Sequence, residues 1–294
     1  MFNAVALTLL KNHLLKPYVL DEEGANIVYA SNQGLAEEYF DHLEFPISNF
    51  WYRYFSSKIN ILPPKNYDNA LDICAGTGTV SLNLMARDFF KKCEAIDISE
   101  TAIAVLKKRI INLNISNLNA ECTNIMNTVY PNNNFDCIFG NSFLHHLPDN
   151  ESFLQEMFRI LKKDGTICFT SEPTKTGAVL ENFFLGNILQ FLRFLKLKPK
   201  QQANQIVLSD IWLYDKKNLV SMLQEVGYTS IHIQGFGFLT ALFNGPSSFL
   251  YQKITKKSMQ PDAWWNFFTT LDKVLFFWLP NNMYSHFSIC ARKP

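Results

Sequence analysis

The stretch from Ala70 to Gly78 constrains the fold of this chain more than any other part of the sequence. Its first five residues are apolar except for Asp72, which is the pattern of a strand buried on both faces of a parallel sheet. Gly76 and Gly78 follow at once, and the largely apolar residues Thr79–Met85 predict a helix. A strand, a glycine turn and a helix in this order predict a doubly wound α/β sheet. Glycines suit the turn because a side chain would fill the space that a nucleotide-like ligand needs.

Asp72 and Ser81 distinguish between two ligand classes for such a turn. A dinucleotide-binding turn has a third small residue three positions after the second glycine, where this chain has Ser81. It does not require an acid four residues before the first glycine, where this chain has Asp72. An acid inside an apolar strand is costly unless it meets a donor or a cation, so Asp72 is expected to have a function.

The arrangement Asp72-x-x-x-Gly76-x-Gly78 resembles the first motif of the class I S-adenosylmethionine-dependent methyltransferases. The resemblance implies that the acid lies near the methionine end of S-adenosylmethionine and that the turn, which includes Ala75, passes beside this cofactor. The alternative interpretation is a purely structural turn with a buried aspartate.

A second acid follows at the end of the next predicted strand, Cys93–Ile98. Asp97 comes 19 residues after Gly78, where a carboxylate can accept hydrogen bonds from both hydroxyls of a ribose. The resemblance continues here, because family members carry an acid at this place and an apolar neighbour, here Ile98, against the adenine. Ser99 is a good N-cap for the helix predicted at 100–111. The alternative interpretation is therefore that Asp97 is merely a neighbour of a helix cap.

The third predicted strand, Asn119–Cys122, precedes the clearest departure from the family pattern. The family usually has an acid just after this strand that contacts the adenine amino group. This chain has Thr123 and Asn124 instead. The side-chain carbonyl of Asn124 can still accept that hydrogen bond, so weaker binding is expected rather than none.

The fourth predicted strand, Phe135–Gly140, is followed by Asn141 and then by Leu-His-His-Leu-Pro, which resembles the family's segment after this strand. Enzymes that methylate nucleic-acid amino groups usually have Asn/Asp-Pro-Pro-aromatic here, so the resemblance disfavours a nucleic-acid substrate. It places Asn141 at the cofactor. His145 or His146 is a candidate base toward a substrate hydroxyl, because imidazole titrates near neutrality. The alternative is that the paired histidines only pack and form hydrogen bonds.

The rest of the chain completes the predicted sheet. The sequence predicts a helix over 150–163, a fifth strand over 166–171 with Glu172 and Pro173 facing the cleft, a helix over 216–226, and strands over 228–235 and 285–292. The resemblance covers residues 68 to about 172 strongly and the last two strands weakly. It implies seven strands, six parallel and the last antiparallel, with helices on both faces.

Two kinds of segment surround the predicted methyltransferase domain, residues 67–294. Residues 1–66 are predicted to form a helical N-terminal lid, with helices over 5–15 and 34–43 and lid candidates Tyr29, Tyr39 and Phe40. Two helical insertions, at about 175–214 and 236–284, are rich in aromatic residues. These aromatics could line an apolar substrate pocket, lie on a membrane surface, form a dimer face, or simply pack on the core.

Composition narrows the class of protein. The chain has 27 basic and 26 acidic residues, which argues against a polyanion-binding protein. The six cysteines include no Cys-x-x-Cys pair, so neither a disulfide nor a metal site is expected, and the usage suits a reducing compartment. The sequence shows no recognisable signal peptide and no clean apolar window of membrane-spanning length, so a cytoplasmic protein is predicted. Peripheral membrane contact and a homodimer stay open.

The predicted function is methyl transfer from S-adenosylmethionine to a small, largely apolar acceptor, at an oxygen, nitrogen or carbon atom. The preference for an apolar acceptor rests on the aromatic insertions and on the lack of basic tracks. Two alternatives stand beside it. One is a non-catalytic member of the fold that serves as a scaffold or partner subunit, and the other is a nicotinamide-dependent oxidoreductase.

Overall fold

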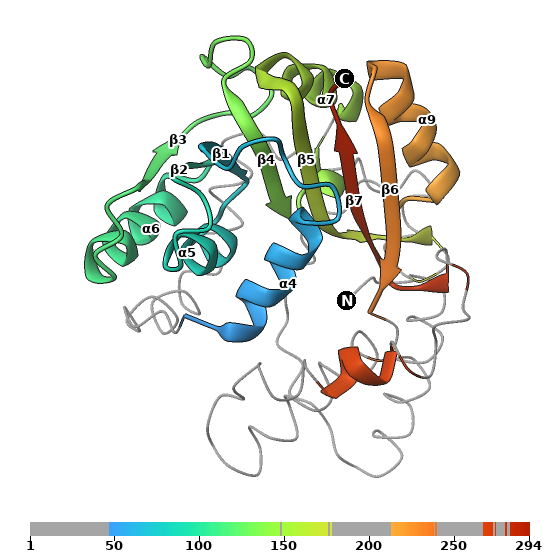
Figure 1. The fold of residues 1–294 in the computed structure, drawn as a ribbon, viewed down its shortest axis with the longest axis horizontal. Coiled ribbons are helices and arrows are strands. Elements are labelled where there is room, and N and C mark those ends of the chain that lie inside the picture. Colours follow the sequence, from blue (N-terminus) through green and yellow to red (C-terminus); the bar gives the residue numbers. More distant parts are fainter. Residues whose placement is uncertain are drawn as a thin grey trace, which may run out of the picture.

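The computed structural model describes residues 47–147, 149–175, 213–237, 267–272 and 283–294, together with the single residues 177, 239, 274 and 280. Within these residues the chain forms one seven-stranded sheet (Figure 1). In chain order its strands are β1 (Asn69–Ile73), β2 (Lys92–Asp97), β3 (Leu118–Cys122), β4 (Phe135–Asn141), β5 (Leu161–Pro173), β6 (Thr229–Phe236) and β7 (His286–Arg292).

The strand order is β3-β2-β1-β4-β5-β7-β6. Neighbouring strands from β3 to β5 pair in parallel, whereas β7 lies between β5 and β6 and runs antiparallel to both. The prediction of seven strands with the last antiparallel is therefore confirmed. The chain builds outward from β1 to β3 and then returns to place β4 on the other side of β1. Such a reversal of strand order leaves a crevice at the carboxyl ends of the strands, where ligands of α/β proteins bind.

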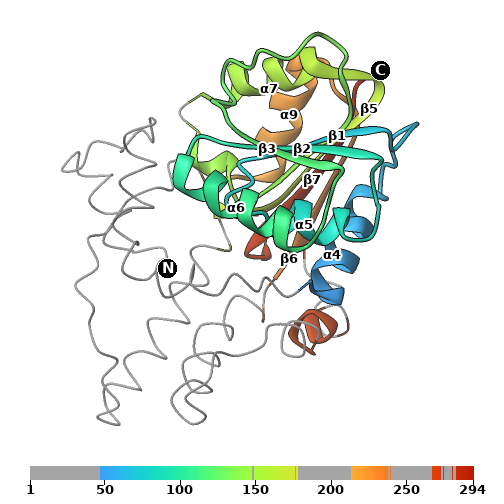
Figure 2. The ribbon, with the colours of Figure 1, turned by 90° about the vertical axis from the view of Figure 1, so that its left-hand side faces the viewer.

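Helices cover both faces of the sheet (Figure 2). One face carries α4 (Asn49–Ile59), α5 (Thr79–Met85) and α6 (Glu100–Asn112), and the other carries α7 (Asn150–Ile160) and α9 (Lys216–Val226). A short 3-10 helix, η1 (Leu144–His146), follows β4. A doubly wound arrangement of this kind follows from right-handed crossovers between parallel strands.

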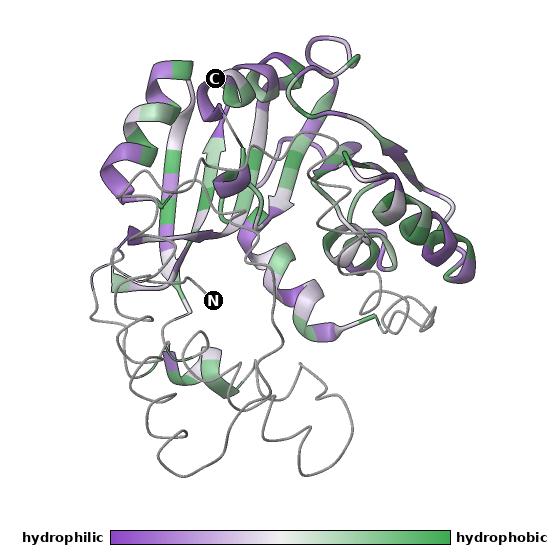
Figure 3. Cartoon of the chain, turned by 180° about the vertical axis from the view of Figure 1, so that it is seen from behind, coloured by the Kyte–Doolittle hydropathy of each residue, from purple (hydrophilic) through white to green (hydrophobic). Residues whose placement is uncertain are grey.

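Two hydrophobic clusters hold these layers together, because alternate residues of a strand point to opposite faces. Leu71 of β1 packs in a cluster that includes Phe153 of α7, and Ala70 packs in the other cluster with Leu82 and Leu106 of α5 and α6. Figure 3 shows hydrophobic residues along the strands, together with some hydrophilic ones, and a mixture of both kinds along the helices. The packed sheet therefore gives rigid support to the loops at its carboxyl edge.

The aromatic run that begins at Phe50 forms α4. Ser48 caps this helix by accepting a hydrogen bond from Trp51 N at 3.1 Å, and Ser48 N donates to Asn83 Oδ1 of α5 at 2.7 Å. Near the other end of α4, the carbonyl of Lys58 accepts a hydrogen bond from Cys290 Sγ of β7. These contacts fix α4 across the face of the sheet that also carries α5.

The boundary between α7 and β5 differs from the prediction, which continues the helix to Lys163. α7 ends at Ile160, and β5 begins at the next residue. Asn133 N donates to the Arg159 carbonyl at 3.0 Å, and Asn134 N donates to the Ile160 carbonyl at 2.7 Å. A segment distant in sequence thus takes the carbonyl oxygens that a further helical turn would have used, which ends the helix early.

Several predictions made from the sequence lie outside the described residues. They are the helices over 5–15 and 34–43, the lid candidates Tyr29, Tyr39 and Phe40, and most of the insertions at 175–214 and 236–284. None of the helices in the part of the chain that the structure describes has the length and hydrophobicity of a membrane span. The same part of the chain contains no group of three or more histidine, cysteine, aspartate or glutamate side chains that could hold a metal ion.

Candidate functional site

The glycine turn after β1 has a left-handed backbone at both of its glycines. Gly76 and Gly78 have φ angles of +55° and +91°, in the left-handed region that side chains disfavour. A Cβ atom on Gly78 would lie 2.3 Å from Leu106 Cδ1, so this position must also stay bare for α5 to pack against α6. Ala75 N donates to the Ile96 carbonyl of β2 at 3.0 Å, which holds the turn against the next strand.

Asp97, at the end of β2, is bonded directly to the glycine turn. Its Oδ2 accepts a hydrogen bond from Gly76 N at 2.8 Å, and its Oδ1 accepts one from Ser99 N at 2.9 Å. The side chain is buried; burial raises its pKa, whereas backbone N–H groups, including those of Ser99 and Gly76, counteract the rise. The predicted ribose acid therefore also has a structural task, because it joins β2 to the turn.

Asp72 is a buried acid with one unsatisfied oxygen. Ser81 N donates to Oδ2 at 3.0 Å, but Oδ1 has no hydrogen-bond partner within the described chain. Burial raises the pKa of Asp72 to about 7, with hydrogen bonds from Ser81 lowering it and the charge of Asp97 raising it. A buried oxygen without a donor, on the strand that leads into the glycine turn, suits a ligand that brings its own donor or positive charge.

The side of the site predicted to hold the adenine is built from the ends of β2 and β3. Ile98 is half-buried directly after Asp97. Thr123 N donates to the Asp97 carbonyl at 2.9 Å, which places the residue after β3 beside β2. Asn124 is exposed, and its Oδ1 accepts a hydrogen bond from Met126 N at 2.9 Å. One of the two lone pairs of this oxygen is therefore used within its own turn.

The carboxyl ends of β4 and β5 form a second group of polar side chains. Asn141 Oδ1 accepts hydrogen bonds from Thr170 Oγ1 and Ser171 Oγ, both at 2.8 Å. His145, in η1 after β4, has its Nδ1 2.7 Å from Glu172 Oε2. Glu172 is completely buried, and His145 is nearly so. These contacts bring together the two loops that follow β4 and β5.

Glu172 also binds the backbone of the turn after β4. Its Oε1 accepts hydrogen bonds from Phe143 N and Leu144 N, both at 3.1 Å, and its Oε2 accepts one from His145 N at 3.2 Å. The sequence predicts only that Glu172 faces the cleft, and it gives this residue no role. Its partners lie 27 to 29 positions earlier in the chain, so no local sequence pattern predicts these contacts.

Cys74, the residue after β1, lies between the two groups. Its thiol pKa is raised by burial and by the charges of Asp97, Asp72 and Glu172, in that order. The structure therefore gathers most predicted site residues at one edge of the sheet. In the sheet, β2 with Asp97 lies on one side of β1, and β4 and β5, whose ends carry His145 and Glu172, lie on the other. His145 has no described contact with the glycine turn.

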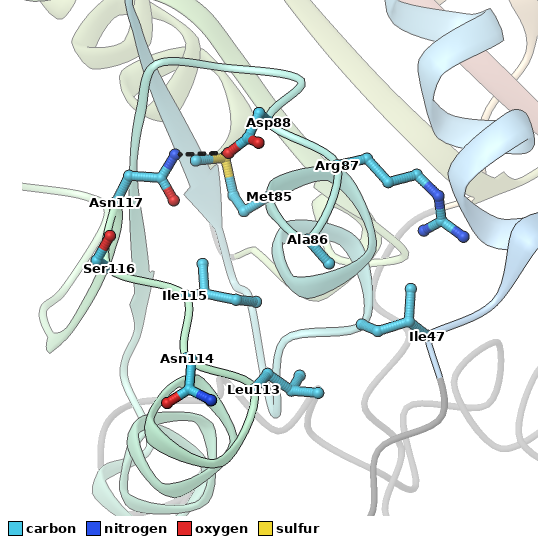
Figure 4. Close-up of a pocket in the computed structure, with 10 residues that line it drawn as sticks. All are labelled: Ile47, Met85, Ala86, Arg87, Asp88, Leu113, Asn114, Ile115, Ser116 and Asn117. Atoms are coloured by element: carbon cyan, nitrogen blue, oxygen red, sulfur yellow. Dashed lines mark hydrogen bonds between the residues drawn. The ribbon is translucent and has the colours of Figure 1, made fainter.

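A pocket of about 630 Å³ lies elsewhere (Figure 4). It is lined by residues at and after the carboxyl-terminal end of α5, by residues after α6, and by Ile47. Both helices begin beside the carboxyl ends of β1 and β2, so their far ends lie at the opposite edge of the sheet. This pocket is therefore not the site built around Gly76 and Asp97.

Comparison with known proteins identifies the family. Residues 71–169 match the family described as "Methyltransferase domain". The chain is 30% identical over 190 residues to a demethylmenaquinone methyltransferase of Bacillus mycoides, covering 61% of this chain and 78% of that protein. It is 28% identical over 183 residues to a demethylmenaquinone methyltransferase of Oceanobacillus iheyensis, covering 60% of this chain and 77% of that protein.

A solved structure supports the fold. The chain is similar to phosphoethanolamine N-methyltransferase 2 of Haemonchus contortus in complex with S-adenosyl-L-methionine, with a TM-score of 0.56 and 15% identity. The likeness covers 82% of this chain and 52% of that one, so the chain spans about half the length of that protein. Identity this low supports the fold alone, whereas the sequence relatives favour methyl transfer over nicotinamide-dependent redox chemistry. With the motif at Asp72–Gly78 and the sheet order in place, these matches show that the chain belongs to the class I S-adenosylmethionine-dependent methyltransferases.

Proposed function

We propose that this enzyme methylates a small, apolar, hydroxyl-bearing ring of the quinol type, at a ring carbon or oxygen. The observation that carries the acceptor class is the likeness to proteins named demethylmenaquinone methyltransferase over three quarters of their length. A quinol ring is flat and apolar, and it carries hydroxyl groups that a base can deprotonate. It thus combines the apolar acceptor predicted from the sequence with the base predicted at His145.

Aromatic side chains of α4 support an apolar ring as acceptor. Trp51 and Tyr54 are half-buried, and Tyr54 packs against Phe236 at the end of β6 with ring centroids 5.7 Å apart. The hydroxyls of Ser288, Ser171 and Thr170 lie near enough to lower the pKa of Tyr54 against the larger rise caused by burial. Because Thr170 and Ser171 stand at the carboxyl end of β5, Tyr54 lies at the edge of the sheet where the cofactor site is built. Aromatic faces bind flat rings by offset or edge-to-face stacking.

The cofactor residues in this proposal are those of the turn and of the strand ends beside it. Asp72 would meet the ammonium, the backbone of Ala75, Gly76 and Gly78 would lie along the cofactor, and Asp97 would bind the ribose. The adenine would lie near Ile98, Thr123 and Asn124, with Asn141 near the methionine end. When bound, S-adenosylmethionine supplies an electrophilic methyl group. The protein then contributes chiefly by holding the acceptor in line with that group.

His145 is the proposed base. It removes the proton of the acceptor hydroxyl, which makes the ring electron-rich and nucleophilic as the methyl group is transferred. The products are the methylated ring, S-adenosylhomocysteine and one proton, so the reaction balances without an oxidant or a metal. Asn141 is held by Thr170 and Ser171, and this fixes its side chain at the carboxyl edge of β4.

Replacing Asp97 by Ala is expected to weaken binding of S-adenosylmethionine by roughly 1–3 kcal/mol, because charge-assisted hydrogen bonds to the ribose are lost. The variant also loses the contact with Gly76 N, so a moderate loss of stability is expected beside it. Isothermal titration calorimetry measures the affinity. Ser99→Ala is the matched control, since it removes the cap of α6 but leaves the carboxylate in place. Equal affinities for wild type and Asp97→Ala would show that Asp97 is not the ribose acid.

The acceptor class is tested with S-adenosylmethionine labelled in its methyl group. A reduced demethylmenaquinone analogue with a short side chain is expected to acquire the label, and phosphoethanolamine and histamine are not. Dithionite keeps the ring reduced, and the same ring in its oxidised form is the control without an acidic hydroxyl. Labelling of the amines but not of the quinol would contradict the proposal.

The remaining partners follow from the same proposal. A small-molecule acceptor is the expected partner, and neither nucleic acid nor a stably bound membrane span is part of the proposed reaction. An acceptor with an apolar tail resides in a bilayer, so the enzyme would work at the cytoplasmic surface of a membrane. A homodimer stays a prediction from the sequence, and size-exclusion chromatography with light scattering tests it.

A further inference from the structure

We propose that Glu172 is the positioning residue for His145. It holds the imidazole in the Nδ1–H tautomer, which makes Nε2 the nitrogen that can accept a proton. The inference rests on the proposed function, in which His145 takes a proton from the acceptor. It adds a residue of β5 to the reaction and states which nitrogen of His145 works as the base. Glu172 does not touch the reacting atoms in this proposal and acts through His145.

Four N–H groups converge on the Glu172 carboxylate. Three are the backbone N–H groups of Phe143, Leu144 and His145, at 3.1 to 3.2 Å, and the fourth belongs to the imidazole at Nδ1, 2.7 Å away. An ionised carboxylate only accepts hydrogen bonds, and backbone amides only donate them. The three backbone contacts therefore assign the acceptor role to Glu172. Nδ1 of His145 must carry the proton that it shares with Oε2.

The tautomer determines the chemistry of the ring. A neutral imidazole with its proton on Nδ1 has its lone pair on Nε2, so Nε2 can take a proton from a hydroxyl. The negative charge of Glu172 then stabilises the imidazolium that forms, in the way that a buried carboxylate supports a histidine base in hydrolases. Because Glu172 has no exposed surface and His145 only 6% side-chain exposure, little water screens this interaction.

The same carboxylate fixes the position of the base. It joins the end of β5 to three successive backbone N–H groups of the turn after β4, so the backbone that carries the imidazole cannot shift without breaking several hydrogen bonds. Removing the charge from a buried carboxylate of this kind is costly for its partners, because donors would be left without acceptors. If Glu172 had a structural role alone, its backbone contacts would be sufficient, and the tautomer of His145 would have no effect on turnover.

Other titratable groups near His145 affect the pH dependence of turnover. The ring of His146 lies 3.9 Å from that of His145, measured between centroids. Tyr214, which precedes α9, has its pKa raised by burial and by the charge of Glu172, and it accepts a hydrogen bond from Asn150 Nδ2 of α7 at 2.8 Å. Tyr214 therefore stays neutral near pH 7. The Glu172 carboxylate is in hydrogen-bond contact with the imidazole.

Glu172→Gln tests the proposal. The amide oxygen of Gln can still accept two backbone hydrogen bonds, but its NH2 group donates and forces the proton of His145 onto Nε2. Turnover of the quinol acceptor is expected to fall about 100-fold or more, because the loss approaches that of a general base. The affinity for S-adenosylmethionine should stay within threefold. The acidic limb of the pH–rate profile should move to lower pH, because the imidazolium loses its stabilising charge.

Glu156→Gln is the matched control. Glu156 of α7 also accepts hydrogen bonds, from Thr128 N and Thr128 Oγ1 and from Arg159, but it lies outside the carboxyl edge. The Glu156→Gln variant is expected to lose some stability but to keep the turnover of the wild type. A folded Glu172→Gln enzyme that keeps wild-type turnover and pH profile would overturn the proposal.

The tautomer itself is measured by 15N NMR of histidine-labelled wild-type protein, with His145→Gln used to assign its signals. A neutral Nδ1–H form supports the proposal, and a neutral Nε2–H form overturns it even where Glu172→Gln does not fold. This measurement needs no acceptor. If the wild type fails to methylate any quinol, the proposed function falls, while the NMR result still decides the tautomer that Glu172 imposes.

Discussion

Replacing Asp72 by Asn is expected to raise the free energy of unfolding above pH 7 by up to about 4 kcal/mol. The reason is the pKa of about 7 that burial gives Asp72 in the fold, against 3.8 for the ordinary carboxyl group. Below pH 4 the acid is protonated in both the folded and the unfolded state and costs nothing. Between pH 4 and 7 the unfolded state ionises first, so the wild type loses stability as the pH rises. Above pH 7 Asp72 is ionised in both states, and the full destabilisation of the folded state remains.

Chemical denaturation at pH 4, 6 and 8 measures this effect without cofactor. The difference between Asp72→Asn and wild type should be small at pH 4 and largest at pH 8. Asp136→Asn is a useful contrast, because the buried Asp136 carboxylate is paired with Lys162 at 3.0 Å and bonded to Asn69 N at 2.8 Å. That variant should lose stability at pH 8. A difference for Asp72→Asn that is independent of pH would mean that Asp72 is ionised in the apo protein.

The same acid should couple cofactor binding to pH. A cation next to Asp72 favours its ionised form, so binding of S-adenosylmethionine near pH 6 is expected to release close to one proton. Calorimetry in buffers of different ionisation enthalpy counts that proton. The release should disappear in Asp72→Asn, and the variant should bind more weakly because the ammonium loses its counter-charge. Equal proton release in both proteins would place the ammonium elsewhere.

Gly76→Val is expected to reduce the affinity for S-adenosylmethionine at least about 100-fold, since a branched side chain fills the space beside the turn and disfavours its φ of +55°. Some stability is lost too, at roughly 1–2 kcal/mol for a side chain forced into the left-handed region. Calorimetry of binding and thermal unfolding separate the two effects.

Gly227→Val supplies the control for backbone strain. Gly227 ends α9 with a φ of +111°, and a Cβ atom there would meet Phe158 at an ordinary contact distance of 3.4 Å. Both variants should therefore lose stability, but Gly227→Val should bind the cofactor normally. A folded Gly76→Val protein with normal affinity would mean that the ligand does not cross this turn.

Most of the strands and helices within residues 68–172 were predictable because their patterns are local. The strand β1, the glycine turn and α5 follow from apolar runs and from two closely spaced glycines, which have positive φ angles in the structure. The approach of Asp97 to the turn follows from its place at the end of β2, although the hydrogen bond to Gly76 N gives it a structural task that the sequence did not indicate.

The early end of α7 was not predictable from its own residues. Helical periodicity continues past Ile160, but Asn133 and Asn134, which come from elsewhere in the chain, donate to the last two carbonyl groups of α7. Local propensity is a weak guide where tertiary partners compete for the same backbone atoms. The roles of the N-terminal aromatics and of the two insertions stay predictions.

The sequence by itself determined the strand–turn–helix unit, the two acids beside it and the histidine pair after β4, because each depends on residues close together in the chain. Only the tertiary structure decided what these groups can do. Burial under α5 sets the protonation of Asp72, and the end of β5 brings Glu172 to His145 across 27 positions of sequence. Proton affinity and tautomer depend on the dielectric and on donors from distant segments, and neither is a property of a residue in its local sequence.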